Sequence, residues 1–219
     1  EGEVAISRAG LGRSEPLAGK TPGLRGPGCV FVLSGPSGGG KTTVVQRLLQ
    51  TIPRAVRSVS VTTRPRRRGE RQGRDYHFVS PAIFQRLRRS GQLLEWANVH
   101  GAYYGTPKRA TLEALAKGSR VILSIDVQGA RQIRRALGRR AVLIFLRPPS
   151  MRELQRRLVG RKTDAPDVIR HRLAAAAREL ACASWYDYTV VNDRLDQAVS
   201  DVEGIVRRGR RGEHGTGGD

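Results

Sequence analysis

The glycine-rich run from Gly35 to Thr42 (GPSGGGKT) constrains the fold of this chain more than any other feature. It matches the pattern G-x-x-x-x-G-K-[ST] of a phosphate-binding loop, the P-loop, which follows a strand and opens a helix. The apolar run Val30–Leu33 precedes it, and Val44–Ile52 carries apolar residues at helical spacing after it. The sequence therefore predicts a strand, a phosphate-binding loop and a helix in succession. The alternative is a glycine-rich turn with an incidental lysine.

Each residue type in this loop suits the binding of a nucleoside triphosphate with Mg²⁺. Glycines let successive backbone N–H groups converge on phosphate oxygens, and the helix that follows directs its positive end to the same point. Lys41 supplies a mobile charge for the β- and γ-phosphates, and the Thr42 hydroxyl can bind Mg²⁺. The loop residues predicted to bind ATP are Gly35, Pro36, Ser37, Gly38, Gly39, Gly40, Lys41 and Thr42. The acceptor stays open, because ATPases, GTPases and small-molecule kinases share such a loop.

Beyond the loop, short apolar runs alternate with amphipathic segments. Strands are expected at Val121–Ile125, Val142–Leu146 and Tyr188–Val191, and the first two are continuously apolar, as in strands buried on both faces. Helices are expected at Pro166–Ala181 and Leu195–Val206. Strands separated by helices are typical of an α/β fold. We therefore predict a parallel sheet of the P-loop NTPase type, flanked by helices.

A further helix is predicted to begin after Ser150. Ser150 and Glu153 have the spacing of a capping box, in which each side chain binds the backbone N–H of the other residue. Met151, Leu154 and Leu158 are expected on one face of this helix.

Length and composition fit a single α/β domain with small insertions, since the chain has 219 residues of which 38% are apolar. It contains no run of ~20 apolar residues and no signal peptide, so we expect a cytoplasmic protein. Cys29 and Cys182 belong to no CxxC pair and are predicted to be buried free thiols. The net charge of +21 attracts polyanions, among which nucleotides and nucleic acids are both candidates.

Three segments depart from the strand and helix alternation. Residues 1–28 and 207–219 lack sustained periodicity, and we expect a flexible arm and a basic flexible tail. Residues 58–106 are rich in Thr, Arg, Gly and Tyr and are predicted to form an inserted subdomain.

Six arginines lie within eleven residues of this insertion. A guanidinium group matches phosphate oxygens in bidentate geometry, so the cluster favours binding of a phosphorylated acceptor. A solvated basic loop is the alternative, and we expect at most two of the six to contact substrate. The six are Arg64, Arg66, Arg67, Arg68, Arg71 and Arg74.

The ordered motifs of residues 29–206 resemble those of the guanylate kinase family. They are SGPSGGGKTT, SVSVTTR followed by GE and DYHF, LLEWA, YYGT, IDVQGA, LRPPS, the GRKT turn before RHRLAAA, and VVND. The resemblance implies a core at 29–57, 107–149 and 173–206. It also implies that the insertion 58–106 is a mixed α/β subdomain that binds a nucleoside monophosphate, and that residues 150–172 form a small helical lid.

The same resemblance implies transfer of the γ-phosphoryl group of ATP to GMP or dGMP, with Mg²⁺. Glu95 would accept the two adjacent N–H donors of guanine, which adenine lacks; a salt bridge from Glu95 to an arginine is the alternative. The residues that would bind GMP are Ser60, Arg64, Arg67, Tyr76, Glu95, Tyr104, Thr106 and Ser124.

On the donor side, the catalytic residues implied by the resemblance are Lys41, Asp126, Arg157, Arg161 and Arg172. The three arginines would close over the transferred phosphoryl group. Thr42 and, through water, Asp126 would hold Mg²⁺, although Asp126 also suits a helix N-cap. Asn192 would lie near the adenine of ATP. Arg156 and Arg170 have similar settings, so the set of inward-pointing arginines stays open.

Three departures from the family pattern bear on these roles. Ser124 stands where an acidic residue is usual, so discrimination of the base depends more on Glu95. Pro65 lies one place earlier than usual, and Lys162 replaces a flexible glycine in the lid turn. None of the three removes a group that phosphoryl transfer needs.

Three other functions fit parts of the sequence. A non-catalytic scaffold is disfavoured by Lys41, Thr42 and Asp126, and a nucleic-acid binder is disfavoured by an aromatic content of 5%. A related kinase with a different phosphorylated acceptor stays open because of Ser124. We expect small-molecule nucleotides as partners, no membrane, and only weak, non-specific binding to nucleic acid at low salt.

Overall fold

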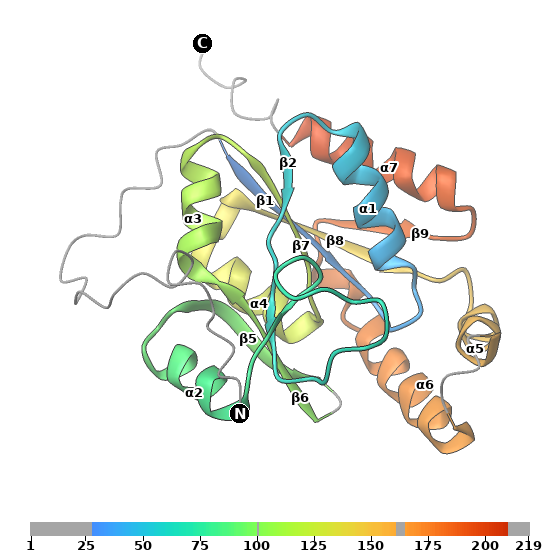
Figure 1. The fold of residues 1–219 in the computed structure, drawn as a ribbon. Coiled ribbons are helices and arrows are strands. Elements are labelled where there is room, and N and C mark those ends of the chain that lie inside the picture. Colours follow the sequence, from blue (N-terminus) through green and yellow to red (C-terminus); the bar gives the residue numbers. More distant parts are fainter. Residues whose placement is uncertain (1–27, 100, 161–164, 210–219) are drawn as a thin grey trace, which may run out of the picture.

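The computed structural model describes residues 28–99, 101–160 and 165–209. Its centre is a five-stranded parallel sheet in the order β2-β7-β1-β8-β9, with helices on both faces (Figure 1). This is the predicted α/β fold, and the four strands predicted from apolar runs are found within one residue of their expected ends. The strands are β1 (Cys29–Ser34), β2 (Ala55–Arg57), β7 (Arg120–Ser124), β8 (Ala141–Arg147) and β9 (Tyr188–Val191).

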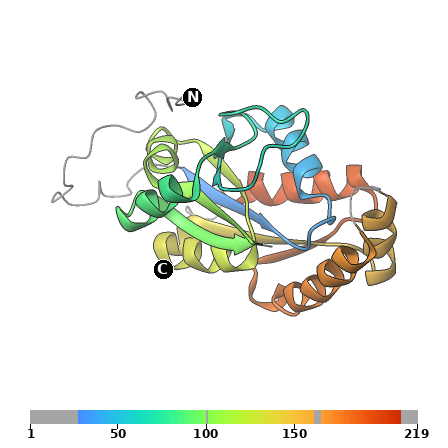
Figure 2. The ribbon, with the colours of Figure 1, turned by 60° about the horizontal axis from the view of Figure 1, so that its bottom comes forward.

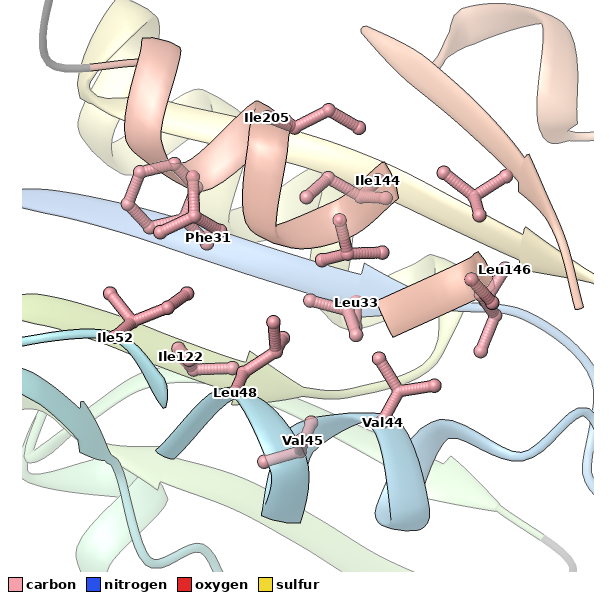
Figure 3. Close-up of a cluster of buried hydrophobic side chains, with 14 residues drawn as sticks. Phe31, Leu33, Val44, Val45, Leu48, Ile52, Ile122, Ile144, Leu146 and Ile205 are labelled. Atoms are coloured by element: carbon pink, nitrogen blue, oxygen red, sulfur yellow. The ribbon is translucent and has the colours of Figure 1, made fainter. Parts of the chain in front are cut away.

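Alternate residues of β1 enter two separate cores, because successive side chains of a strand point to opposite faces. Phe31 and Leu33 lie in the core between the sheet and helices α1 and α7, which Figure 3 shows. Val30 and Val32 lie in the opposite core, under α3 and α4. The covering helices are α1 (Lys41–Thr51), α3 (Lys108–Ala116), α4 (Val127–Leu137) and α7 (Leu195–Arg208).

A second sheet lies in the segment predicted as an insertion. Its order is β4-β3-β6-β5, with β3 and β4 parallel and the other neighbours antiparallel. Phe84 and Leu87 of helix α2 pack against Val61 of this sheet. The elements are β3 (Val61–Thr62), β4 (His77–Phe78), α2 (Pro81–Arg89), β5 (Leu93–Val99) and β6 (Ala102–Pro107).

Helices α5 (Met151–Gly160) and α6 (Pro166–Leu180) pack on each other beyond the carboxyl ends of the main strands (Figure 2). Leu154 and Leu158 of α5 are buried in a small core with Ala176 of α6, as the predicted helical face requires. Met151, expected on the same face, is 36% exposed because it is the first residue of the helix, at the edge of this core.

Some predicted boundaries fall inside continuous helices. Residue 172, the predicted end of the lid, lies within α6, and α7 extends to Arg208, so the predicted tail at 207–219 begins within that helix. Residues 1–27 and 161–164, including Arg161 and Lys162, lie outside the described residues. Two 3₁₀ helices, η1 (Gly138–Arg140) and η2 (Ala183–Trp185), complete the element list.

The two cysteines are free thiols, as predicted, but both are half-buried rather than buried. Cys29 is the first residue of β1, and Cys182 follows the end of α6, so each lies at the margin of the packed layers. Within the described part of the chain, no helix is long and apolar enough to cross a membrane.

Candidate active site

The P-loop joins β1 to α1 and has the backbone geometry that its glycines permit. Gly35 and Gly40 have φ angles of 139° and 90°, which L-residues with a side chain rarely adopt. A Cβ atom at Gly35 would lie 2.0 Å from the carbonyl oxygen of Leu146, and one at Gly40 would lie 2.2 Å from Nδ2 of Asn192. The loop is therefore enclosed by β8 and by the segment after β9, and both positions require glycine.

Lys41 begins α1 and folds back over the loop. Its Nζ donates to the carbonyl oxygens of Gly35 and Pro36 at 2.5 and 3.0 Å. No side chain caps the first turn of α1, and this turn contains no acidic residue, so its backbone N–H groups are suited to an anion. Thr42 lies exposed in this turn, with its side chain accessible from solvent.

Asn192 holds the P-loop from the side. It follows β9, is 5% exposed, and donates from Nδ2 to the carbonyl oxygen of Gly39 at 2.8 Å. Its backbone N–H donates to Arg147 at the end of β8, also at 2.8 Å. The side chain therefore has a structural contact that the sequence motif did not predict, while its contact with adenine stays a prediction.

Glu95 and Thr106 face each other on paired strands β5 and β6. The Thr106 hydroxyl donates to Oε1 of Glu95 at 2.6 Å, and Glu95 is only 3% exposed. A Cβ atom at Gly129 would lie 2.3 Å from Oε2 of Glu95, so this carboxyl group is packed against the first turn of α4. The alternative of a salt bridge to an arginine is not seen among the described residues.

The surroundings of Glu95 favour its neutral form. Burial raises the pKa of Glu95 to about 7, the hydrogen bond from Thr106 opposes this rise, and the charge of Asp126 adds to it. A buried carboxyl group of this kind is ready to ionise when donors approach its free oxygen.

Asp126 follows β7 and caps α4, as its alternative role predicted. Its Oδ1 accepts the backbone N–H of Gly129 at 2.9 Å, and its Oδ2 accepts from Gln128 Nε2 at 3.2 Å. Burial raises the pKa of Asp126, whereas these hydrogen bonds and the charge of Lys41 lower it. Although Asp126 caps α4, it still lies near the P-loop, because Lys41 is close enough to lower the pKa of Asp126. Ser124, two residues earlier, is half-buried at the end of β7.

The arginine cluster is partly organised by one acidic residue. Arg64 forms an ion pair with Glu70 at 2.7 Å, and Glu70 also accepts the backbone N–H of Arg67 at 2.8 Å. The Arg64 guanidinium carbon lies 5.5 Å from the centre of the Tyr76 ring, and Tyr76 meets Tyr104 edge to face at 5.9 Å.

A cleft of about 460 Å³ brings parts of the insertion together with α6. Arg64, Arg67 and Tyr104 line it from the insertion, and Arg172 lines it from α6. Residues predicted from three separate segments therefore line one cleft. Ser60 lies nearby in the chain, half-buried just before β3, where its carbonyl oxygen accepts the backbone N–H of His77.

Arg157 of α5 contacts the donor side directly. Its Nε donates to Oε1 of Glu153 at 2.8 Å, and its terminal nitrogen donates to the carbonyl oxygen of Asn192 at 3.0 Å. Arg161, the neighbouring predicted arginine, lies outside the described residues.

Glu179 lies within electrostatic reach of Lys41 and Asp126, which the sequence interpretation did not predict. It lies near the end of α6, half-buried, and burial raises its pKa while the charge of Lys41 lowers it. The charge of Asp126 raises the pKa of Glu179 further, so all three groups lie within electrostatic reach of each other. Its only sequence signal was an isolated acidic residue in an alanine-rich helix.

These features define a class of protein. A P-loop after the central strand, an acidic residue after the neighbouring strand β7, and an arginine and tyrosine cluster on a second sheet form a site for two phosphorylated ligands. The fold and site are those of a P-loop kinase that acts on a small phosphorylated acceptor.

Comparisons with known proteins identify the family. The guanylate kinase family model matches residues 28–208. The guanylate kinase of Dechloromonas aromatica is 49% identical over 180 residues, covering 82% of this chain and 89% of the relative. That of Oleidesulfovibrio alaskensis is 51% identical over 175 residues, covering 80% and 84%. The crystal structure of guanylate kinase from Anaplasma phagocytophilum has a TM-score of 0.72 at 36% identity, covering 85% of this chain and 88% of that one. The chain belongs to the guanylate kinase family.

Proposed function

We propose that this chain transfers the γ-phosphoryl group of ATP to GMP, and to dGMP, giving ADP and GDP or dGDP. The observation that carries the choice of acceptor is the buried pair of Glu95 and Thr106 beside the arginine-lined cleft. Family membership and the relatives' activity support the same reaction.

Glu95 supplies the discrimination between bases. Guanine presents its N1–H and its exocyclic amine side by side, and one ionised carboxylate accepts both. These donors favour the charged form, so binding of guanine lowers the raised pKa of Glu95. Adenine has no donor at either place and leaves a buried polar group unpaired, which costs about 1–3 kcal/mol and more for a charge.

The donor phosphates bind at the P-loop. Backbone N–H groups of the loop and of the first turn of α1 face the phosphate oxygens, and Lys41 exchanges its carbonyl partners for the β- and γ-phosphates. Mg²⁺ prefers oxygen ligands and retains several waters. The exposed Thr42 hydroxyl and the Asp126 carboxylate, the latter through water, are oxygen ligands of that kind and would hold the metal, which would neutralise part of the phosphate charge.

Phosphoryl transfer asks the protein for alignment and positive charge around the moving group. Arg172 faces the acceptor cleft, and Arg157 contacts the wall of the P-loop. We assign these two, together with Arg161, to neutralisation of the transferred phosphoryl group. Arg64, Arg67, Tyr76, Tyr104 and Ser60 hold the acceptor phosphate.

Ser124 adjusts the strength of acceptor binding. A hydroxyl can accept or donate one hydrogen bond but carries no charge, so the base is bound mainly through Glu95. A Ser124→Asp variant is therefore expected to bind GMP more tightly than the parent chain.

A substrate panel tests the proposed function. ADP release is measured with GMP, dGMP, AMP, CMP, UMP and ribose phosphates as acceptors, for the parent chain and for Glu95→Gln. We expect GMP and dGMP to be the best acceptors, and the variant to lose roughly 100-fold in kcat/KM for GMP with KM for ATP unchanged.

The control is Glu113→Gln, the same chemical change at an exposed ion pair with Arg109 on α3. It is expected to match the parent chain. Highest activity on an acceptor without guanine overturns the assignment of the acceptor. An equal loss of ATP binding in Glu95→Gln overturns the role of Glu95.

A further inference from the structure

Glu153 does not complete the capping box that its spacing predicts. The hydroxyl of Ser150 accepts the backbone N–H of Glu153 at 3.1 Å, which is one half of the box. The carboxylate of Glu153 instead accepts hydrogen bonds from Arg156 and Arg157. The side chain that should cap the helix is thus engaged with a predicted catalytic arginine.

Arg157 is held from two sides. Its Nε is bound to Glu153 at 2.8 Å, and its terminal nitrogen is bound to the carbonyl oxygen of Asn192 at 3.0 Å. The side chain of Asn192 donates to Gly39 of the P-loop at 2.8 Å. An unbroken series of contacts therefore runs from Glu153 through Arg157 and Asn192 to the loop that binds the donor phosphates.

The packing below this series fixes its geometry. A Cβ atom at Gly38 would lie 3.0 Å from Cδ2 of Leu158 and 3.1 Å from Cδ1 of Leu154. Helix α5 therefore lies directly on the P-loop, and both leucines are buried. The backbone of α5 is packed against the loop, and the guanidinium of Arg157 is held there by its hydrogen bonds to the Glu153 carboxylate and to the carbonyl oxygen of Asn192.

We propose that Glu153 is a positioning residue for phosphoryl transfer, which holds the guanidinium of Arg157 against Asn192 at the edge of the donor phosphate site. The proposal rests on the role assigned above to Arg157. It adds a residue that contacts neither nucleotide and acts through another side chain.

The physical advantage is preorganisation. A free arginine side chain samples many rotamers and must be ordered each time the transferred group needs its charge. A guanidinium held by a carboxylate on one side and a carbonyl on the other starts each turnover already near the phosphates. Glu153 stays ionised through the neutral range, because Arg156 and Arg157 lower its pKa to about 2.

Arg156 provides a matched control within the same cluster. It binds the same carboxylate at 2.8 and 2.9 Å, but its side chain is 79% exposed, compared with 24% for Arg157. If Glu153 only stabilises the helix, its ion pairs with Arg156 and Arg157 should matter equally. If Glu153 positions a catalytic group, only its ion pair with Arg157 should affect kcat.

The test is a set of variant cycles on the full chain, with kcat and KM measured for ATP and GMP and unfolding followed in urea. Glu153→Ala is expected to lower kcat roughly 10- to 100-fold, with KM for GMP within about twofold of the parent. Glu153→Gln, which keeps one acceptor oxygen, is expected to recover part of that loss. Arg156→Ala is expected to leave kcat unchanged.

The double variants decide the mechanism. Glu153→Ala is expected to lower kcat little further when Arg157 is already alanine, and by its full factor when Arg156 is alanine. Equal losses on both backgrounds overturn the proposal. The proposal is also overturned if Glu153→Ala keeps the kcat of the parent chain while Arg157→Ala has a lower kcat.

Failure of the proposed function has a different signature. If Arg157→Ala alone keeps the parent kcat, the role of Arg157 is wrong and the positioning role of Glu153 is wrong with it. If the parent chain does not phosphorylate GMP, the acceptor assignment fails before any variant is compared.

Discussion

Glu95 shows at the scale of one residue how burial prepares a group for its ligand. Its carboxyl group lies between Thr106 and the first turn of α4, nearly out of contact with water. The family motif identified this residue in the sequence, but the motif could not give its protonation. That depends on Thr106, Gly129 and Asp126, which the fold brings together from two separate motifs, YYGT and IDVQGA.

A pH dependence of stability follows from this burial. The pKa of Glu95 rises from its usual 4.5 to about 7 in the folded chain, so the folded state binds more protons than the unfolded state between these values. The contribution of Glu95 is therefore fully present below pH 4.5 and is lost as the pH rises through 7, by on the order of 3 kcal/mol.

The measurement is the free energy of unfolding in urea at pH 5 and pH 8, for the parent chain and Glu95→Gln without nucleotide. The difference between the two chains is expected to change by that amount in favour of the parent at pH 5. Asp126 and Glu179 also have raised pKa values and contribute to the pH dependence of both chains. An identical pH dependence in the two chains contradicts the prediction.

At the scale of elements, the sequence predicted long units better than short ones. Strands β1, β7 and β8 were recognisable because burial on both faces makes them continuously apolar, whereas β9 lies at the edge of the sheet and buries only Val190. The second sheet was expected only as an insertion. Two of its strands have two residues each, too few for a periodic pattern, and their pairing partners are distant in sequence.

The side-chain partners within the site were also beyond sequence reasoning. The P-loop residues follow from one contiguous pattern with a fixed backbone conformation. Glu153 and Arg157 have the i, i+4 spacing of a local helical pair. The contacts of Asn192 and Glu179 instead depend on how α5, α6 and the end of β9 pack around that loop. Tertiary packing of this kind leaves no local signal in the chain.

Asn192→Ala tests the connection between the P-loop and the segment after β9. Removing the amide leaves the carbonyl oxygen of Gly39 buried without this donor and opens a small cavity, so we expect a loss of about 1–3 kcal/mol in unfolding free energy. We also expect weaker ATP binding, with GMP binding near the parent value. Calorimetric titration with a non-hydrolysable ATP analogue and urea unfolding provide the two measurements. Full retention of both stability and ATP affinity would show that the bond has no structural importance.

At the scale of the whole molecule, the net charge of +21 gives the chain a general attraction for polyanions. The arginines that line the acceptor cleft use part of this charge for one ligand. We expect the remaining positive charge to attract nucleic acid only weakly and without sequence preference.

Binding to DNA is therefore expected to depend steeply on salt. The chain should be retained on immobilised duplex DNA at about 20 mM salt and released by about 150 mM, because such binding is driven by release of counterions. An uncharged matrix serves as the control for retention by other means. Retention that resists physiological salt, or a preference for one DNA sequence, would point to a second function for the basic surface.

The first turn of α4 contacts residues that we assign to both substrate sites, the donor site and the acceptor site. Asp126, which we assign to Mg²⁺, caps this turn by accepting the N–H of Gly129, and the same Gly129 abuts the carboxyl group of Glu95, which we assign to the base. We therefore expect a nucleobase that fits imperfectly and shifts Glu95 to disturb a backbone segment that also contacts Asp126. IMP, which keeps N1–H but lacks the exocyclic amine, should consequently show a lower kcat as well as a higher KM. A wrong base would then weaken both acceptor binding and phosphoryl transfer, because both depend on the first turn of α4. An unchanged kcat for IMP would show that base recognition and phosphoryl transfer are independent.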